Sequence, residues 1–136
     1  MALHLEIVTP ERKVFSDTVE DVYLPGADGE MGVLETHAAL VTAMDAGELR
    51  YRKEGKVTEL AVGKGFAEVD QHKVTILTDV AFEEDQIDES KVEEAMKRAE
   101  EALEGIDPEN AEEVAAQQAA IANALAQLKL KRKRRG

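Results

Sequence analysis

The segment LPGADGEMGVLETHAALVTAMDAGELR, which runs from Leu24 to Arg50, decides the fold of the chain. It holds four of the nine glycines, at positions 26, 29, 32 and 47, and one of the three prolines. Proline favours extended backbone in the residue before it, and glycine accepts the positive φ angles of tight turns. The segment therefore predicts a strand that ends near Gly26, a tight loop with Glu30 as the acid at its tip, two short strands, and a second turn at residues 45–47.

Short runs of apolar residues flank this segment from residue 1 to residue 84. Near the N-terminus, Leu3, Leu5 and Ile7 alternate with polar residues, as in a strand that buries one face. Residues 53–56 separate two further runs and predict a hairpin turn. The runs recur roughly every 8–12 residues with turn residues between them, which is typical of a β-sandwich or barrel.

The hydrophobic period changes near residue 85, which predicts one domain of residues 1–84 and another of residues 85–136. From Val92 onward, apolar residues follow the i, i+3, i+4, i+7 spacing of an amphipathic helix. We expect Asp88 to be the N-cap of this helix and Gly105 to mark its end.

A second helix is expected to begin with Asp107 as its cap and Pro108 as its first residue. Eight alanines between Ala111 and Ala126 give it a high helix propensity and small side chains. The two helices should form an antiparallel hairpin that is held weakly, since few large apolar residues are available to bury, and that is a candidate mobile element. A permanently docked hairpin is the alternative. The stripe expected to be buried in the second helix is Val114, Gln118, Ile121, Leu125 and Leu128.

Charge is distributed unevenly along the chain. Residues 1–128 contain 29 acidic and 11 basic residues, a net charge of −18, whereas residues 129–136 contain six basic residues and no acidic one. The acidic body disfavours nucleic acid and anionic membranes, while the basic tail favours nucleic acid, membranes or an acidic protein surface. A solvated, disordered end is the alternative interpretation of the tail.

The sequence contains no evident constellation for catalysis or metal binding. The three histidines, at positions 4, 37 and 72, lack metal-ligand spacing, there is no cysteine, and no phosphate-binding or nucleophile motif is found. No apolar run reaches the roughly 18 residues of a membrane span, and no secretory signal is visible. The residues alone indicate a soluble β-domain with a helical appendage, acting as a binding or regulatory module. Two rival classes are a nucleic-acid-binding protein that uses the basic tail and an enzyme with an unrecognised acidic site.

A resemblance to a known family extends this interpretation. The opening segment, followed by GKGFAEVDQHKVTILTD at residues 63–79, IDESK at residues 87–91 and an alanine-rich helix pair, resembles the epsilon subunit of bacterial and chloroplast F-type ATP synthases. The likeness covers essentially the whole chain and includes the pair His37-Ala38. It implies an α+β fold in which an N-terminal antiparallel β-sandwich of about ten strands precedes a C-terminal antiparallel two-helix hairpin.

The resemblance also implies a non-catalytic role in the central stalk, where the sandwich couples proton flow through the ring of c subunits to ATP synthesis. The expected partners are the gamma subunit and the c-ring, with no nucleic acid, at the cytoplasmic face of the bacterial plasma membrane and in contact with the membrane only through the complex. The positions that match the ring-contacting loop are Gly26, Asp28, Gly29, Glu30, Met31 and Gly32. The positions that match the gamma-facing surface are Thr9, His37 and Thr42.

In bacterial relatives the second helix can extend along gamma into the catalytic head, where it meets the alpha and beta subunits and inhibits ATP hydrolysis. Basic residues near its end then meet an acidic segment of the beta subunit, as expected for lysine and arginine against carboxylates. The bases of this chain that fit such an inhibitory tail are Lys129, Lys131, Arg132, Lys133, Arg134 and Arg135.

Some relatives bind ATP in the folded hairpin through the motif Ile/Leu-Asp-x-x-Arg-Ala. This chain keeps Ile87 and Asp88, but Lys91 replaces the arginine and Val92 replaces the alanine. A lysine cannot reproduce the planar fork of an arginine, and residues 108–128 supply no base for the phosphates. We therefore expect weak ATP binding or none, no cofactor and no metal, with Asp88 acting as a helix cap.

Overall fold

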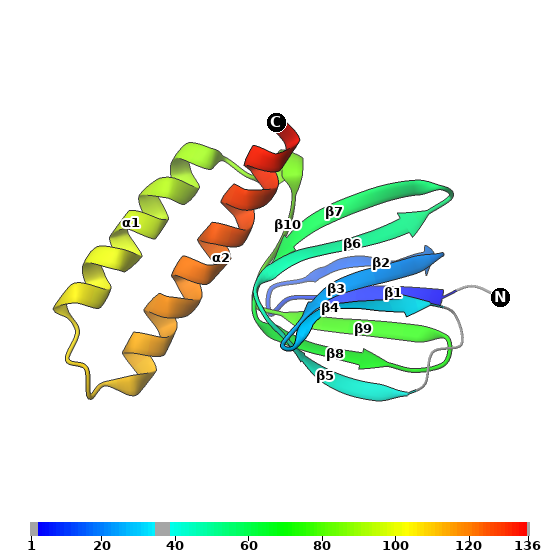
Figure 1. Ribbon diagram of the computed structural model, residues 1–136, viewed down its shortest axis with the longest axis horizontal. Helices are drawn as coiled ribbons and strands as arrows, with labels where there is room; N and C mark the ends of the chain where they lie inside the picture. Colours follow the sequence, from blue (N-terminus) through cyan, green and yellow to red (C-terminus); the bar gives the residue numbers. More distant parts are fainter. Residues whose placement is uncertain (1–2, 35–38, 136) are drawn as a thin grey trace.

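The computed structural model describes residues 3–34 and 39–135, which form a curved sheet followed by two helices (Figure 1). Within these residues the sheet has ten strands, in the order β10-β7-β6-β3-β5-β8-β9-β1-β2, and β4 pairs with β3 beside this path. The strands are β1 (Leu3–Val8), β2 (Lys13–Val19), β3 (Asp21–Gly26), β4 (Gly29–Leu34), β5 (Leu40–Met44), β6 (Gly47–Lys53), β7 (Lys56–Val62), β8 (Gly65–Val69), β9 (Lys73–Thr78) and β10 (Ala81–Glu83).

The sheet folds back on itself because β3 pairs with strands of both halves. Residues 21–23 of β3 pair with β6, whereas Gly26 at its end pairs with Met44 of β5. All described strand pairs are antiparallel except β1 with β9, which is parallel. The expected α+β fold with a ten-stranded sandwich and a helical hairpin is therefore confirmed, and its sheet is mixed because of this one parallel pair.

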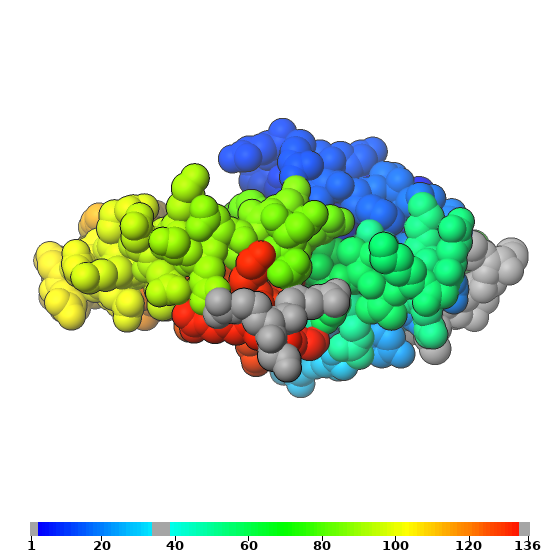
Figure 2. Space-filling view, turned by 90° about the horizontal axis from the view of Figure 1, so that it is seen from above, coloured from blue at the N-terminus to red at the C-terminus, as the bar shows by residue number. Residues whose placement is uncertain are grey.

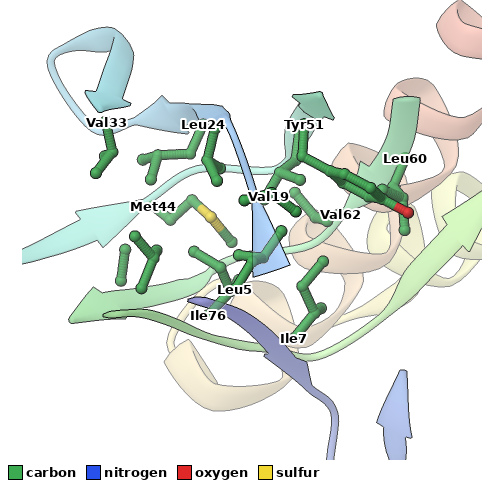
Figure 3. Packing of buried hydrophobic residues seen from close by; sticks show 14 of the residues in the cluster. Leu5, Ile7, Val19, Leu24, Val33, Met44, Tyr51, Leu60, Val62 and Ile76 are labelled. Atoms are coloured by element: carbon green, nitrogen blue, oxygen red, sulfur yellow. The ribbon is translucent and has the colours of Figure 1, made fainter. Parts of the chain in front are cut away.

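The core lies between the two halves of the folded sheet (Figure 3). Every second residue of a strand points inward, so Leu5 and Ile7 of β1 meet Ile76 of β9, Leu24 of β3 and Met44 of β5 in one cluster. All five side chains are at most 1% exposed. Burial of each such side chain stabilises the fold by about 1.5–3 kcal/mol, which makes this cluster the main source of the sandwich's stability.

Two tight turns follow the glycine signals of the sequence. The β6–β7 turn has positive φ angles at Glu54 (52°) and Gly55 (79°), as in a two-residue hairpin turn of type I′. The β3–β4 hairpin turns at residues 27–28, and Gly29 follows with a φ of 121°, a conformation that L side chains rarely adopt. The predicted turns at residues 53–56 and after Gly26 are thus confirmed.

A single 3₁₀ turn, η1 (Glu84–Gln86), connects the sheet to helix α1 (Glu89–Gly105). The Asp88 carboxylate accepts a hydrogen bond from the backbone N–H of Lys91 at 3.2 Å, which confirms the predicted N-cap. Helix α1 ends at Gly105, as expected.

The second helix, α2 (Ala111–Arg135), begins three residues later than predicted. The carboxylate of Asp107 accepts from the N–H of Glu109 at 2.9 Å, so Asp107 forms a turn before the helix and does not cap it. The cap is Asn110, whose side-chain oxygen accepts from the N–H of Glu113 at 3.3 Å while its amide donates to the Glu113 carboxylate at 3.1 Å. Asp107 and Asn110 are both residues that favour caps, and they lie three positions apart. The helix begins after Asn110, because Asn110 and Glu113 hydrogen-bond to each other reciprocally.

Helix α2 lies between α1 and the outer face of β6 and β7 (Figure 1), and its last half makes the close contacts. Its buried residues are Ala124, Ala126, Leu128 and Leu130. The predicted stripe is therefore wrong at Gln118 and Leu125, which are exposed, and the expectation that the hairpin lacks large buried residues is wrong at Leu128 and Leu130. Further toward its N-terminus, the helix leaves a cavity of about 710 Å³ against the β5–β6 turn and Lys64. Among the described residues, no helix is long and apolar enough to cross a membrane.

We predict that the sandwich tolerates no side chain at Gly65, whereas the hairpin gains from one at Gly105. A Cβ at Gly65 would lie 1.8 Å from the Leu77 carbonyl oxygen, and one at Gly105 would meet nothing within 4 Å. Gly65→Ala should lower the free energy of unfolding by about 2–3 kcal/mol, as overpacked sites do. Gly105→Ala should raise it by about 0.5 kcal/mol because alanine favours the helix. Urea denaturation measures both; equal stability of Gly65→Ala and the wild type would contradict the close packing of β8 on β9.

Candidate functional site

The six positions expected to contact the c-ring all lie on the β3–β4 hairpin, but Glu30 is not at its tip. The tip consists of Ala27 and Asp28, and Glu30 lies in β4 opposite Pro25. The Glu30 carboxylate accepts hydrogen bonds from the guanidinium of Arg50 at 2.9 and 3.5 Å. Glu30 is exposed, as expected, but its expected position at the loop tip is wrong. Asp28 lies at the tip, and Glu30 joins the hairpin to β6 through Arg50.

The side chain of Tyr23 packs against residues on both sides of strand β3 of the hairpin. The guanidinium of Arg50 lies 4.5 Å from the centre of the Tyr23 ring, in a cation–π arrangement. The other side of the hairpin supplies Gly32, where a Cβ would lie 2.8 Å from the same ring. Gly32 is thus required by packing within the chain, and the tip of the hairpin is tied to β5 by a hydrogen bond from the N–H of Ala27 to the carbonyl of Ala43 at 3.1 Å.

The positions expected to face gamma are placed differently from one another. Thr9 follows β1 and donates its hydroxyl to the carbonyl of Arg12 at 3.2 Å. Thr42 pairs with the buried Ala67 of β8, so its side chain is directed to the face of the sheet opposite to Val41. His37 lies outside the described residues.

Sequence analysis missed an exposed apolar patch on β5, β8 and β9. Val41, Phe66 and Leu77 are 69%, 57% and 43% exposed, and we call these three residues the apolar patch. Phe66 and Leu77 face each other across β8 and β9, and Thr9 lines the same shallow cavity of about 360 Å³. The sequence contained a signal for this patch, since Phe66 and Leu77 occupy positions of the alternating strand pattern that face away from the core. The structure thus brings Thr9 to the apolar patch and turns Thr42 away from it.

The basic tail is helical as far as Arg135, so the interpretation as a disordered end is wrong. Lys129 is exposed, whereas Lys131, Arg132 and Lys133 each bind carboxylates elsewhere in the chain. Figure 2 shows this end of α2, in red, beside the green strands and the start of the first helix. The carboxylates that bind the tail are Glu48 of β6, Glu59 of β7, Glu84 of η1, and Glu89 and Glu93 of α1.

The electrostatics of this region are dominated by two neighbouring carboxylates around one ammonium group. Lys133 donates to Glu48 at 3.0 Å and to Glu59 at 2.7 Å. Burial raises the pKa of Glu48, the Glu59 carboxylate raises it further, and Lys133 opposes both effects. Hydrogen bonds to Glu59 and Glu48 in turn raise the pKa of Lys133, which therefore stays charged at neutral pH.

The three residues considered for ATP binding have structural roles. Ile87 is 4% exposed and packs in a small cluster with Ala61, Ala126 and Leu130. Asp88 caps α1 through the backbone N–H of Lys91, whose side chain is exposed. Within the part of the chain that the structure describes, no group of three or more histidine or acidic side chains is arranged to hold a metal ion.

A ten-stranded sandwich with a docked two-helix hairpin, in which the described residues form ion pairs and an apolar patch, is the structure of a small binding or regulatory subunit. The family model described as "ATP synthase, Delta/Epsilon chain, beta-sandwich domain" matches residues 2–84. A relative named ATP synthase epsilon chain from Pelotomaculum thermopropionicum is 48% identical over 99 residues, which cover 73% of this chain and 74% of the relative. Another from Geobacter metallireducens is 39% identical over 128 residues, 94% of this chain and 92% of the relative.

The chain therefore belongs to the family of ATP synthase epsilon chains, and it is a subunit of ATP synthase and not an enzyme in its own right. Among solved structures, a chain of the Euglena gracilis mitochondrial ATP synthase (OSCP/F1/c-ring) superposes with a TM-score of 0.75 at 24% identity, covering 94% of this chain and 79% of that one. A chain of the Tetrahymena thermophila mitochondrial ATP synthase central stalk and c-ring gives a TM-score of 0.59 at 14% identity, covering 100% and 98%. These two likenesses concern the fold. The resemblance noted in the sequence is confirmed, and the nucleic-acid-binding alternative is not favoured.

Proposed function

We propose that residues 1–84 bind the gamma subunit and the c-ring, and that residues 85–136 are a regulatory unit that inhibits ATP hydrolysis when it extends toward the alpha and beta subunits. In this role the chain couples proton flow through the ring to ATP synthesis in the catalytic head. Its place is the cytoplasmic face of the bacterial plasma membrane, reached through the complex. The observation that carries the first part of the proposal, binding of gamma, is the apolar patch.

The apolar patch supports binding of gamma because an exposed aromatic group beside two aliphatic ones is the kind of centre around which protein interfaces form. Val41 and Phe66 are both more than half exposed, so their burial by a partner would remove a large apolar area from water. Thr9, with the exposed Lys64 and Asp79 that line the same cavity, would form the rim of such an interface. We therefore assign this face of the sandwich to the gamma subunit in the proposed complex.

The β3–β4 hairpin supports contact with the c-ring because contacts within the chain hold its exposed tip in place. At the tip, Asp28 is exposed and the backbone N–H of Ala27 donates to the carbonyl of Ala43 at 3.1 Å. The ion pair of Glu30 with Arg50 and the close approach of Gly32 to Tyr23 hold the base of the hairpin. A loop that is already ordered loses little conformational entropy when it binds, which suits a contact that must transmit torque.

We predict that a charge in the apolar patch weakens binding of gamma without unfolding the sandwich. Phe66→Glu should lower the affinity for gamma by at least about tenfold, as loss of an aromatic interface centre does. Val57→Glu is the matched control, since Val57 is 47% exposed on β7, at the other side of the sandwich (Figure 1). Pull-down of gamma by the two variants, each shown to be folded by circular dichroism, measures the effect. Equal retention of gamma by both variants would count against this face as the gamma interface.

The second part of the proposal concerns the basic tail. Helix α2 has 25 residues, a length of about 37 Å at 1.5 Å per residue, which suffices to carry the tail from the stalk into the head. Lysine and arginine side chains there would meet carboxylates of the beta subunit in a partly enclosed site, where screening is weaker than in bulk solvent.

We predict that replacing all six tail bases by alanine raises ATP hydrolysis by the purified complex severalfold and leaves synthesis largely unchanged. The reason is that the extended helix would lose its electrostatic partners in the head. A control with Lys56, Lys97 and Arg98 replaced by alanine removes exposed positive charge elsewhere and should hydrolyse ATP like the wild type. Hydrolysis by the six-alanine variant that equals the wild type at all nucleotide concentrations would show that the tail is not the brake.

A further inference from the structure

Three consecutive residues of the tail reach three different parts of the chain. Lys131 contacts the carboxylate of Glu84 in η1 at 3.2 Å and the backbone carbonyl of the same residue at 3.3 Å. Arg132 contacts Glu89 and Glu93 of α1 at 3.0 and 3.3 Å. Lys133, in turn, bridges β6 and β7 through its two glutamates.

The helix geometry explains this divergence. Successive residues of an α-helix point about 100° apart, so three in a row cover more than half of its circumference. The end of α2 lies beside η1, α1 and the sheet (Figure 1). Each of the three cations forms its ion pairs with a different one of these neighbours. The cations therefore tie α2 to all of its neighbours at once, and they do so within one turn.

The apolar contact beneath these ion pairs is small. Ala61 on the outer face of β7 meets Ala126 and Leu130 of α2 and Ile87 of the linker, with Phe82 and Val92 at the margin. Two of these buried residues are alanines, so the area that docking removes from water is modest. The ion pairs are partly shielded, since the side chain of Glu59 is 12% exposed and that of Glu89 is 20% exposed. A network of this kind contributes more than isolated surface pairs.

The pair Glu48 and Glu59 gives the docked position a specific need for a cation. The two carboxylates are close enough for Glu59 to raise the pKa of Glu48, and Lys133 lies on both. Departure of α2 leaves two neighbouring negative charges without this ammonium group, and it frees three cations for another acidic surface. Docking and binding to an acidic partner therefore require the same side chains.

We propose that Lys131, Arg132 and Lys133 form an electrostatic latch with the chain's own glutamates, and that in the assembled complex these cations exchange to carboxylates of a partner when the hairpin extends. This inference rests on the proposed function for its second half, the exchange. The first half, the latch, concerns the isolated chain alone. Together, the two halves predict opposite effects on ATP hydrolysis: loss of the glutamates that hold the tail should lower it, and loss of the tail bases should raise it.

The latch is tested in the isolated full chain by thiol labelling at Ala126→Cys. Ala126 is 8% exposed on the face of α2 that packs against Ala61, and the chain has no cysteine of its own, so the labelling rate reports release of the hairpin. The double substitution Glu48→Gln/Glu59→Gln should raise this rate about fivefold, the scale expected for loss of a partly buried ion-pair network. The matched control Glu100→Gln/Glu101→Gln removes the same charge at the far end of α1 and should leave the rate unchanged.

A second variant approaches the same contact from the other side. Lys133→Gln should also raise the labelling rate. Its combination with Glu48→Gln/Glu59→Gln should give no further increase, because the two sets of substitutions remove the same interaction. Unchanged labelling in the glutamine variants, with circular dichroism like that of the wild type, would overturn the latch whatever the tail does in the complex.

The exchange is tested by ATP hydrolysis in the assembled complex. Glu48→Gln/Glu59→Gln should lower hydrolysis, since a released tail inhibits more, whereas loss of the tail bases should raise it. Faster labelling together with unchanged or increased hydrolysis would overturn the exchange and, with it, the proposed brake, while the latch would stand.

Discussion

The position of the whole hairpin depends on the contact between the end of α2 and the outer face of β6 and β7. The contact combines a small apolar cluster around Ala61 and Leu130 with the ion pairs of Lys131, Arg132 and Lys133. Helix α1 packs mainly on α2. The position of α1 relative to the sandwich therefore depends on the docking of α2. A contact of one small apolar cluster and partly exposed charges fixes the docked position, and its cost of opening is lower than that of the sandwich core.

The sandwich and the hairpin have separate apolar clusters that share one strand. On β7, Leu60 and Val62 belong to the core of the sandwich, whereas Ala61 between them belongs to the cluster with α2. Departure of the hairpin would expose Ala61 and its neighbours and would leave the core, with Leu5 and Ile76, untouched. This division fits the proposal that residues 1–84 bind the partner subunits while residues 85–136 regulate ATP hydrolysis by moving away from the sandwich.

Much of the fold could be predicted from the sequence because local signals agreed with the final structure. Alternating residues such as Leu3, Leu5 and Ile7 identified the strands, and the residues at 53–56 identified a hairpin turn. The place of Glu30 could not be predicted, because it depends on the register of β3 against β4 and on Arg50, twenty residues away. The partners of Lys133 are 74 and 85 residues distant, and no local pattern joins them. The interfaces thus depend on long-range placement, which periodicity does not contain.

The central claim is that the hairpin leaves the sandwich as a unit within the assembled enzyme. It is tested most directly by the distance between spin labels at Lys56→Cys and Gln118→Cys, two exposed positions on β7 and α2 in a chain without other cysteines. The isolated chain should give one distance, that of the docked structure. The assembled complex should give a second, longer distance whose share rises with inhibition of ATP hydrolysis. A single docked distance in the complex, at every level of inhibition, would contradict the account.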